Sequence, residues 1–167
     1  IMDMADDIAY STYDLEDSFK AQFVQPTDLV FAPDPLLESI AHKMGDRINK
    51  TEVRTILART FVEVFQLSGD DLEKNAVFEK SAVELVEYAQ YVYDQSRDIV
   101  DNGYRRIEVT SQLVDSFIRD VKLIWNPDEP VLSEIKIDEV TRNQIEVLKH
   151  FTYIKLIQSS MMRVAEY

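Results

Sequence analysis

Apolar side chains recur every three to four residues along most of this chain, and this spacing constrains its fold more than any other feature. The period matches one face of an α-helix, whereas a half-buried strand would alternate apolar and polar residues. No clear alternation stands out, and residues 131–137 are the one ambiguous segment. The spacing predicts helices over residues 1–24, from Pro35 to about Gly45, over 51–67, over 72–100 as one or two helices, over 104–125 and over about 138–167. We therefore expect an all-α fold.

Proline, glycine and asparagine separate the predicted helices. Asp34 followed by Pro35 predicts an N-cap and a first helical turn, because Asp accepts bonds from free amides there and Pro has no amide to leave unpaired. Residues 68–71 predict a turn, Asn102 and Gly103 predict a second break, and residues 126–130 predict a loop. With 167 residues, 46% of them hydrophobic, the chain is long enough to bury a core.

Composition and charge exclude several classes of protein. The chain has no cysteine, so it has neither a disulfide framework nor a thiolate metal site. It has no apolar run near the roughly 20 residues of a membrane helix and nothing resembling a signal peptide, so we expect a cytoplasmic protein. The formal net charge is -13, which argues against nucleic acid or an anionic membrane as a partner and is compatible with binding cations.

Acidic residues gather in the first predicted helix, where residues 1–19 contain six of them and no basic residue. Asp6, Tyr10 and Asp14 recur at intervals of four, so they form a row on one helix face that spans about 12 Å. Like charges at such spacings repel, and a divalent cation or a hydrogen-bonding ligand would relieve the repulsion. The pattern by itself also fits an ordinary solvated face.

The apolar stripe of the same helix lies almost opposite this row and consists of Ile1, Met4, Ile8, Leu15 and Phe19. A second set of apolar or small side chains borders the row, namely Met2, Ala5, Ala9 and Tyr13. A helix with apolar surface on more than one side usually has a second partner. We therefore expect another segment to cover this side of the helix.

The run from Met4 to Asp17 closely resembles the last metal-binding motif of the deoxynucleoside triphosphate triphosphohydrolases, the dGTPase-like members of the HD-domain superfamily. The segments 148–153 and 162–167 are similar to the C-terminal helices of that family. The resemblance implies that Asp6 is a metal ligand and that Tyr10 and Asp14 contact the phosphates and the sugar of the substrate. Asp7 is the second choice for the role of Asp6, and Tyr13 stands where many relatives have histidine.

No His-Asp dipeptide occurs in the chain, although the family pattern requires one. By the resemblance, the other ligands would lie upstream of Ile1, which already falls within a helical pattern and is not an initiator Met. We therefore expect the C-terminal part of a larger HD-domain-like helical bundle, inactive alone. Residues 1–24 would form its last metal-binding helix, and residues 25–167 the rest of the C-terminal helical part.

The activity implied by the resemblance is hydrolysis of a dNTP, with dGTP favoured, to a deoxynucleoside and triphosphate. The implied cofactor is a divalent ion such as Mg²⁺, Mn²⁺ or another transition metal, and the implied assembly is a homo-oligomer. Arg142, Lys149 and Arg105 are candidates for binding the triphosphate. Two alternatives stay open: a non-enzymatic helical interaction domain whose acidic face binds a basic partner, and a cation site without catalysis.

Overall fold

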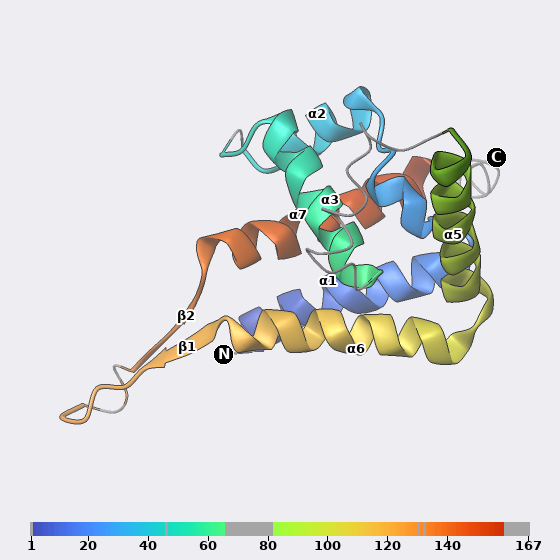
Figure 1. Ribbon diagram of the computed structural model, residues 1–167. Helices are drawn as coiled ribbons and strands as arrows, with labels where there is room; N and C mark the ends of the chain where they lie inside the picture. Colours follow the sequence, from blue (N-terminus) through green and yellow to red (C-terminus); the bar gives the residue numbers. More distant parts are fainter. Residues whose placement is uncertain (1, 46, 66–81, 130, 132, 159–167) are drawn as a thin grey trace, which may run out of the picture.

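The computed structural model describes residues 2–45, 47–65, 82–129, 131 and 133–158. Helices dominate these residues, and two short strands form a single hairpin, so the predicted all-α class is confirmed (Figure 1). The elements follow the chain in the order α1 (Met2–Lys20), η1 (Pro26–Leu29, a 3-10 helix), α2 (Asp34–Lys43), α3 (Lys50–Val64), α5 (Ala82–Asp101), α6 (Gly103–Arg119), β1 (Val121–Ile124), β2 (Glu134–Ile137) and α7 (Glu139–Gln158).

Helix α1 packs against both α6 and α7, while α2 and α3 cover another side of α7 (Figure 1). The predicted stripe of α1 faces this core, since Ile8, Leu15 and Phe19 are buried. Phe117 of α6 and Phe151 of α7 are fully buried in the same cluster. Burial of this apolar face, rather than local helix propensity, is what stabilises α1 in the fold.

Helix α1 ends at Lys20, earlier than the predicted end near residue 24. Gln22 adopts a left-handed conformation with φ of 61°, and its amide donates to the Phe19 carbonyl at 3.1 Å. The Phe23 amide donates to the Ser18 carbonyl at 3.0 Å, which completes a Schellman motif. The predicted end was wrong for two reasons. The motif has Gln22 in place of the glycine that usually marks a helix end. Phe23 and Val24 also continue the apolar pattern, although they pack against the core after the helix has ended.

The start of α2 also differs from the prediction. Pro33 is the N-cap and Asp34 is already the first helical residue, with no side-chain cap bond. The Asp34 carboxylate instead forms ion pairs with Lys50 at 3.1 Å and Arg54 at 2.7 Å, and both of these residues belong to α3. A tertiary contact therefore replaces the predicted local cap.

Helices α5 and α6 meet at the predicted break, where the Asn102 side chain caps α6 by accepting from the amides of Tyr104 and Arg105. The predicted turn at 68–71 and the first part of the predicted 72–100 region lie outside the described residues. Helix α7 begins at Glu139 as expected, and the residues predicted to extend it, 159–167, also lie outside the described part.

The predicted helix over residues 104–125 was wrong at its end, because α6 stops at Arg119 and residues 121–124 form β1. Strand β1 pairs antiparallel with β2, with Val121 opposite Ile137 and Leu123 opposite Ile135. The ambiguous 131–137 segment thus supplies the partner strand. In a helix, the backbone N–H and C=O groups of residues 121–124 would bond to residues of the same segment. In the hairpin, they bond instead to the opposite strand. The hairpin projects from the helices between α6 and α7 (Figure 1).

Candidate functional site

The acidic row occupies the outer face of α1. Asp6 and Asp14 are exposed, and the Tyr10 side chain between them is 61% exposed. This face points away from the core because the opposite face of α1, which carries Ile8, Leu15 and Phe19, is buried. Ser11 and Thr12, on that buried side, donate hydrogen bonds to the Ile8 carbonyl at 2.9 and 2.8 Å. The row is therefore available to a ligand along its length.

Asp6 and Asp7 differ in their surroundings. The Asp7 carboxylate accepts a bond from the Lys149 ammonium of α7 at 2.7 Å, and Lys149 also lies 3.5 Å from Glu146. Burial lowers the pKa of Lys149, but the two carboxylates together outweigh it, so the net pKa is raised. In the described part of the chain, no ion pair or hydrogen bond occupies the Asp6 carboxylate.

Asp14 lies beside a cavity of 330 Å³ between the C-terminal end of α1 and α7. Partial burial, followed by repulsion from Asp17, raises the pKa of the Asp14 carboxyl. Phe23, Thr152 and Tyr153 also line this cavity. Asp14 therefore combines an exposed face along the row with a concave surface at its side.

The three candidates for binding triphosphate differ in their partners. Lys149 is engaged by Asp7 and Glu146, and Arg105 is paired with Glu108 at 2.5 Å on α6. Arg142 is exposed and borders a 240 Å³ cavity together with Asp3 and Asp7 of α1. The structure therefore brings Arg142 and Lys149 to α1.

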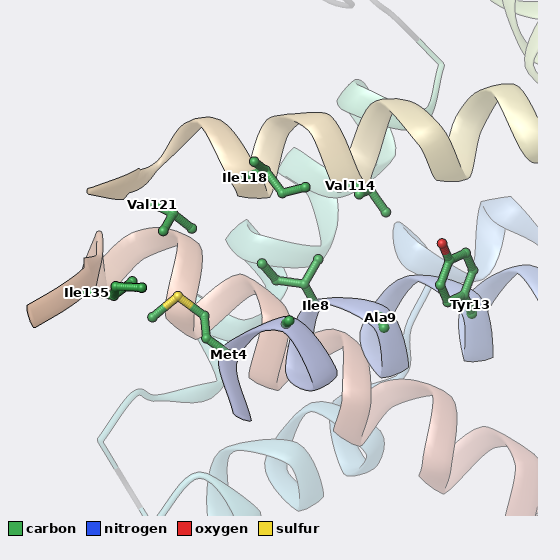
Figure 2. Close-up of a pocket in the computed structure, with 9 residues that line it drawn as sticks. Met4, Ile8, Ala9, Tyr13, Val114, Ile118, Val121 and Ile135 are labelled. Carbon is green, nitrogen blue, oxygen red and sulfur yellow. The ribbon is translucent and has the colours of Figure 1, made fainter. Parts of the chain in front are cut away.

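An apolar groove flanks the row on its other side (Figure 2). Ala9 and Tyr13 of α1 face Val114 and Ile118 of α6 across it, and Val121 and Ile135 of the hairpin line one end. Its volume is 330 Å³. Tyr13 and Ile118 remain 55% and 56% exposed. The partner expected on this side stays a prediction.

A metal ion fits the donor chemistry of Asp6, since an unpaired carboxylate suits a hard divalent cation. Over the described ranges, however, no group of three or more His, Asp or Glu side chains is arranged to hold a metal ion. The described residues therefore do not complete a metal site around Asp6.

Within the same ranges, no helix combines the length and the apolar character required to cross a membrane.

The chain was compared with known proteins. The chain is 33% identical over 184 aligned residues to deoxyguanosinetriphosphate triphosphohydrolase-like protein 2 of Mesorhizobium japonicum. The similarity covers all of this chain and 38% of the length of the relative. The predicted resemblance to dGTPase-like proteins is thereby confirmed. No family model matches the chain, and no solved structure matches it.

Two features of the site were missed by sequence reasoning. One is the ion pair between Lys149 of α7 and Asp7 of α1. The other is the cavity beside Asp14, to which Thr152 and Tyr153 of α7 contribute. No local signal could have identified either feature, because each depends on residues of α7 that are remote from α1 in the sequence.

Proposed function

We propose that this chain is part of a metal-dependent dNTP triphosphohydrolase that converts a dNTP, with dGTP favoured, to a deoxynucleoside and triphosphate. The observation that carries the proposal is the exposed row of Asp6, Tyr10 and Asp14, in a chain similar over its whole length to a dGTP triphosphohydrolase-like protein. The chain covers only 38% of the length of that relative. Hydrolysis of a dNTP by the whole protein is therefore part of what we propose.

Asp6 is the proposed metal ligand. Its carboxylate has no partner among the described residues, whereas the ion pair with Lys149 would have to be broken before Asp7 could bind a cation. When bound, a divalent ion would polarise a phosphate oxygen and neutralise negative charge as water attacks the α-phosphorus. The remaining ligands would come from outside the described residues.

Tyr10 and Asp14 are proposed to position the substrate. The exposed Tyr10 hydroxyl can donate a hydrogen bond to a phosphate oxygen. Ionised Asp14 accepts hydrogen bonds and repels phosphate, so a sugar hydroxyl is its suitable partner. Asp14 lies two helical turns from Asp6, about 12 Å along the axis, which suits a sugar lying beyond the α-phosphate. Self-association, implied by the resemblance, is also part of the proposal.

The test is Asp6→Ala in a full-length protein that contains this chain. We expect loss of metal-dependent triphosphate release, measured by anion-exchange chromatography, with the fold retained by circular dichroism. Asp3→Ala is the matched control, because Asp3 is an exposed acid on the same helix outside the row. Full activity of the Asp6→Ala variant would overturn the proposal.

A second candidate is a non-enzymatic interaction domain. It is favoured by the exposure of the acidic face and by the lack of a metal-ligand cluster among the described residues. It predicts salt-sensitive binding of a basic protein partner and no effect of dNTPs on the melting temperature. A rise in melting temperature with dGTP and Mn²⁺ in the full-length protein would argue against it.

A further inference from the structure

The hairpin of β1 and β2 has no part in the proposed roles of the acidic row. It projects from the helices (Figure 1), and within the described ranges these two strands form a sheet without a third member. An isolated two-stranded hairpin is only marginally stable in water, whereas three or more strands with an apolar face can be stable. The outer edge of a strand also presents backbone N–H and C=O groups that can pair with another strand. The hairpin is therefore suited to accept a further strand.

One face of the hairpin is apolar and is exposed toward its tip. Leu123 lies opposite Ile135 across the two strands, on the same face as Val121 and Ile137. Val121 and Ile137 pack against the core at the base of the hairpin. Further out, Leu123 is 61% exposed, and Trp125, which follows β1, is 59% exposed. The outer part of this face is therefore an apolar surface that a wider sheet would extend.

The other face of the hairpin carries charges that restrict the choice of partner strand. Lys136 lies directly opposite Lys122, and like charges in this position destabilise a pair of strands. Glu134 is on the same face of β2, with its carboxylate 3.3 Å from the Lys136 ammonium. Both side chains of this ion pair are exposed. A strand that places a carboxylate beside Lys136 and an ammonium beside Glu134 would therefore match β2 in charge.

Strand β2 of a second copy is such a partner. In an antiparallel pair of two β2 strands centred on Ile135, Glu134 of each copy lies opposite Lys136 of the other. The two Ile135 side chains then meet on the apolar face, between the Leu123 side chains of the two copies. β2 contains no proline, so all of its amides can donate to a ladder. β1 contains a lysine and no acid, so its edge has no matching register with itself.

We propose that the outer edge of β2 pairs with the same edge of a second copy, so that two hairpins form one antiparallel sheet about a two-fold axis. The inference rests on the self-association within the proposed function, to which it adds a surface. Antiparallel pairing sets the helices of the two copies at opposite ends of the sheet, which limits the repulsion between two chains of net charge -13. The strand has only 4 residues, so we expect a weak dimer with a Kd of about 10–100 µM.

The first experiment measures the dimer Kd of the 167-residue chain by sedimentation equilibrium. Glu134→Lys and Lys136→Glu each place like charges opposite one another, so each should weaken the dimer by about tenfold. An equimolar mixture of the two variants should associate at least as tightly as the wild type, because every charged pair across the mixed dimer is then attractive. Neither variant retains the ion pair within β2, so this recovery can only come from contact between copies. Lys122→Glu on β1 is the matched control and should change the Kd by less than about threefold.

A single introduced cysteine tests the register, because the chain has no cysteine of its own. Opposite residues of antiparallel strands have Cα atoms about 4.5–5.5 Å apart, which is within the range of a disulfide. Ile135→Cys should therefore give a disulfide-linked dimer under mild oxidation, detected by non-reducing electrophoresis. Leu123→Cys is the control, because three strand spacings, about 14 Å, separate the two cysteines in the proposed sheet. It should cross-link more slowly, although Leu123 is the more exposed residue.

A chain that stays monomeric up to about 1 mM, a mixture of the charge variants that does not associate, or equal cross-linking of the two cysteine variants would each overturn the inference. Failure of the proposed function is distinguishable, because it is read from Asp6→Ala activity with metal in the full-length protein. Pairing through β2 together with full activity of Asp6→Ala would reject the metal role and retain the interface.

Discussion

Asp6 and Asp7 are neighbours in the sequence, but they belong to different environments. Asp7 turns toward α7 and is paired with Lys149, with its side chain 44% exposed, whereas Asp6 lies on the outer face. A half-exposed ion pair contributes little to stability, about 0.2–1 kcal/mol, so the pair acts mainly to keep Asp7 occupied. Of the two carboxylates, Asp6 is the one that is exposed and has no ion-pair partner among the described residues.

This difference predicts that substitution of Asp7 lowers the free energy of unfolding more than substitution of Asp6. Asp7→Ala should lower the free energy of unfolding of the chain by up to about 1 kcal/mol, because Lys149 loses its closest partner. Asp6→Ala should leave the stability within about 0.5 kcal/mol of the wild type, because the side chain is exposed and has no bond to any described residue. Urea denaturation followed by circular dichroism measures both, and a larger loss for Asp6→Ala would contradict the assignment.

His150 on α7 predicts a pH dependence of stability. Burial lowers its pKa below the ordinary value of 6.5, and the attraction of Glu146 offsets this only in part. The unfolded chain therefore takes up a proton first as the pH falls, so the free energy of unfolding should decrease below about pH 6.5. His150→Gln should flatten this part of the profile. Thermal melts between pH 5.5 and 8 provide the test, and an unchanged slope in the variant would count against it.

At the scale of elements, α6 carries a core face and a groove face side by side. Phe117 is fully buried, whereas the next residue, Ile118, is 56% exposed at the apolar groove. Phe117→Ala should cost about 3–5 kcal/mol through lost burial and a cavity. Ile118→Ala should cost less than about 1 kcal/mol in this chain. Similar losses in denaturant titrations would show that the groove is closed in solution.

The ends of α1 and α2 offer a matched pair of left-handed residues. Gln22 has φ of 61° and Gly45 has φ of 67°. A side chain disfavours this conformation, so Gln22→Gly should stabilise the chain by up to about 1 kcal/mol, while Gly45→Ala should destabilise it by about 1 kcal/mol. Melting temperatures measure both, and a shift of the same sign in the two variants would contradict the role of backbone strain.

At the scale of the whole molecule, the helices present the acidic row on one side without completing a metal site among the described residues. We therefore predict that the 167-residue chain alone does not hydrolyse dGTP in the presence of Mg²⁺ or Mn²⁺. Release of triphosphate above a no-protein blank, measured by ion chromatography, would show that the chain contains the remaining catalytic groups. The full-length protein serves as the positive control.

Much of the helical fold could be predicted from the sequence, because each helix carries its own apolar period. The predicted helix boundaries were wrong where a contact with a distant segment decides the structure. They were also wrong where a helix ends without the glycine that usually marks its C-terminus. Residues 121–124 look helical until Glu134–Ile137 pair with them, and Gln22 ends α1 without the glycine that normally marks such an end. The Asp34 side chain does not cap α2, because it forms ion pairs with Lys50 and Arg54 of α3, which is again a contact with another segment.

The sequence by itself determined the helical class and the common face of Asp6, Tyr10 and Asp14, because the 3.6-residue period is a local property of the backbone. Only the tertiary structure decided that Asp7 is paired with Lys149 and that Asp14 borders a cavity containing Thr152. These contacts join residues more than 130 positions apart. Such contacts arise when buried apolar faces bring α1 and α7 together, and no spacing within one helix encodes them.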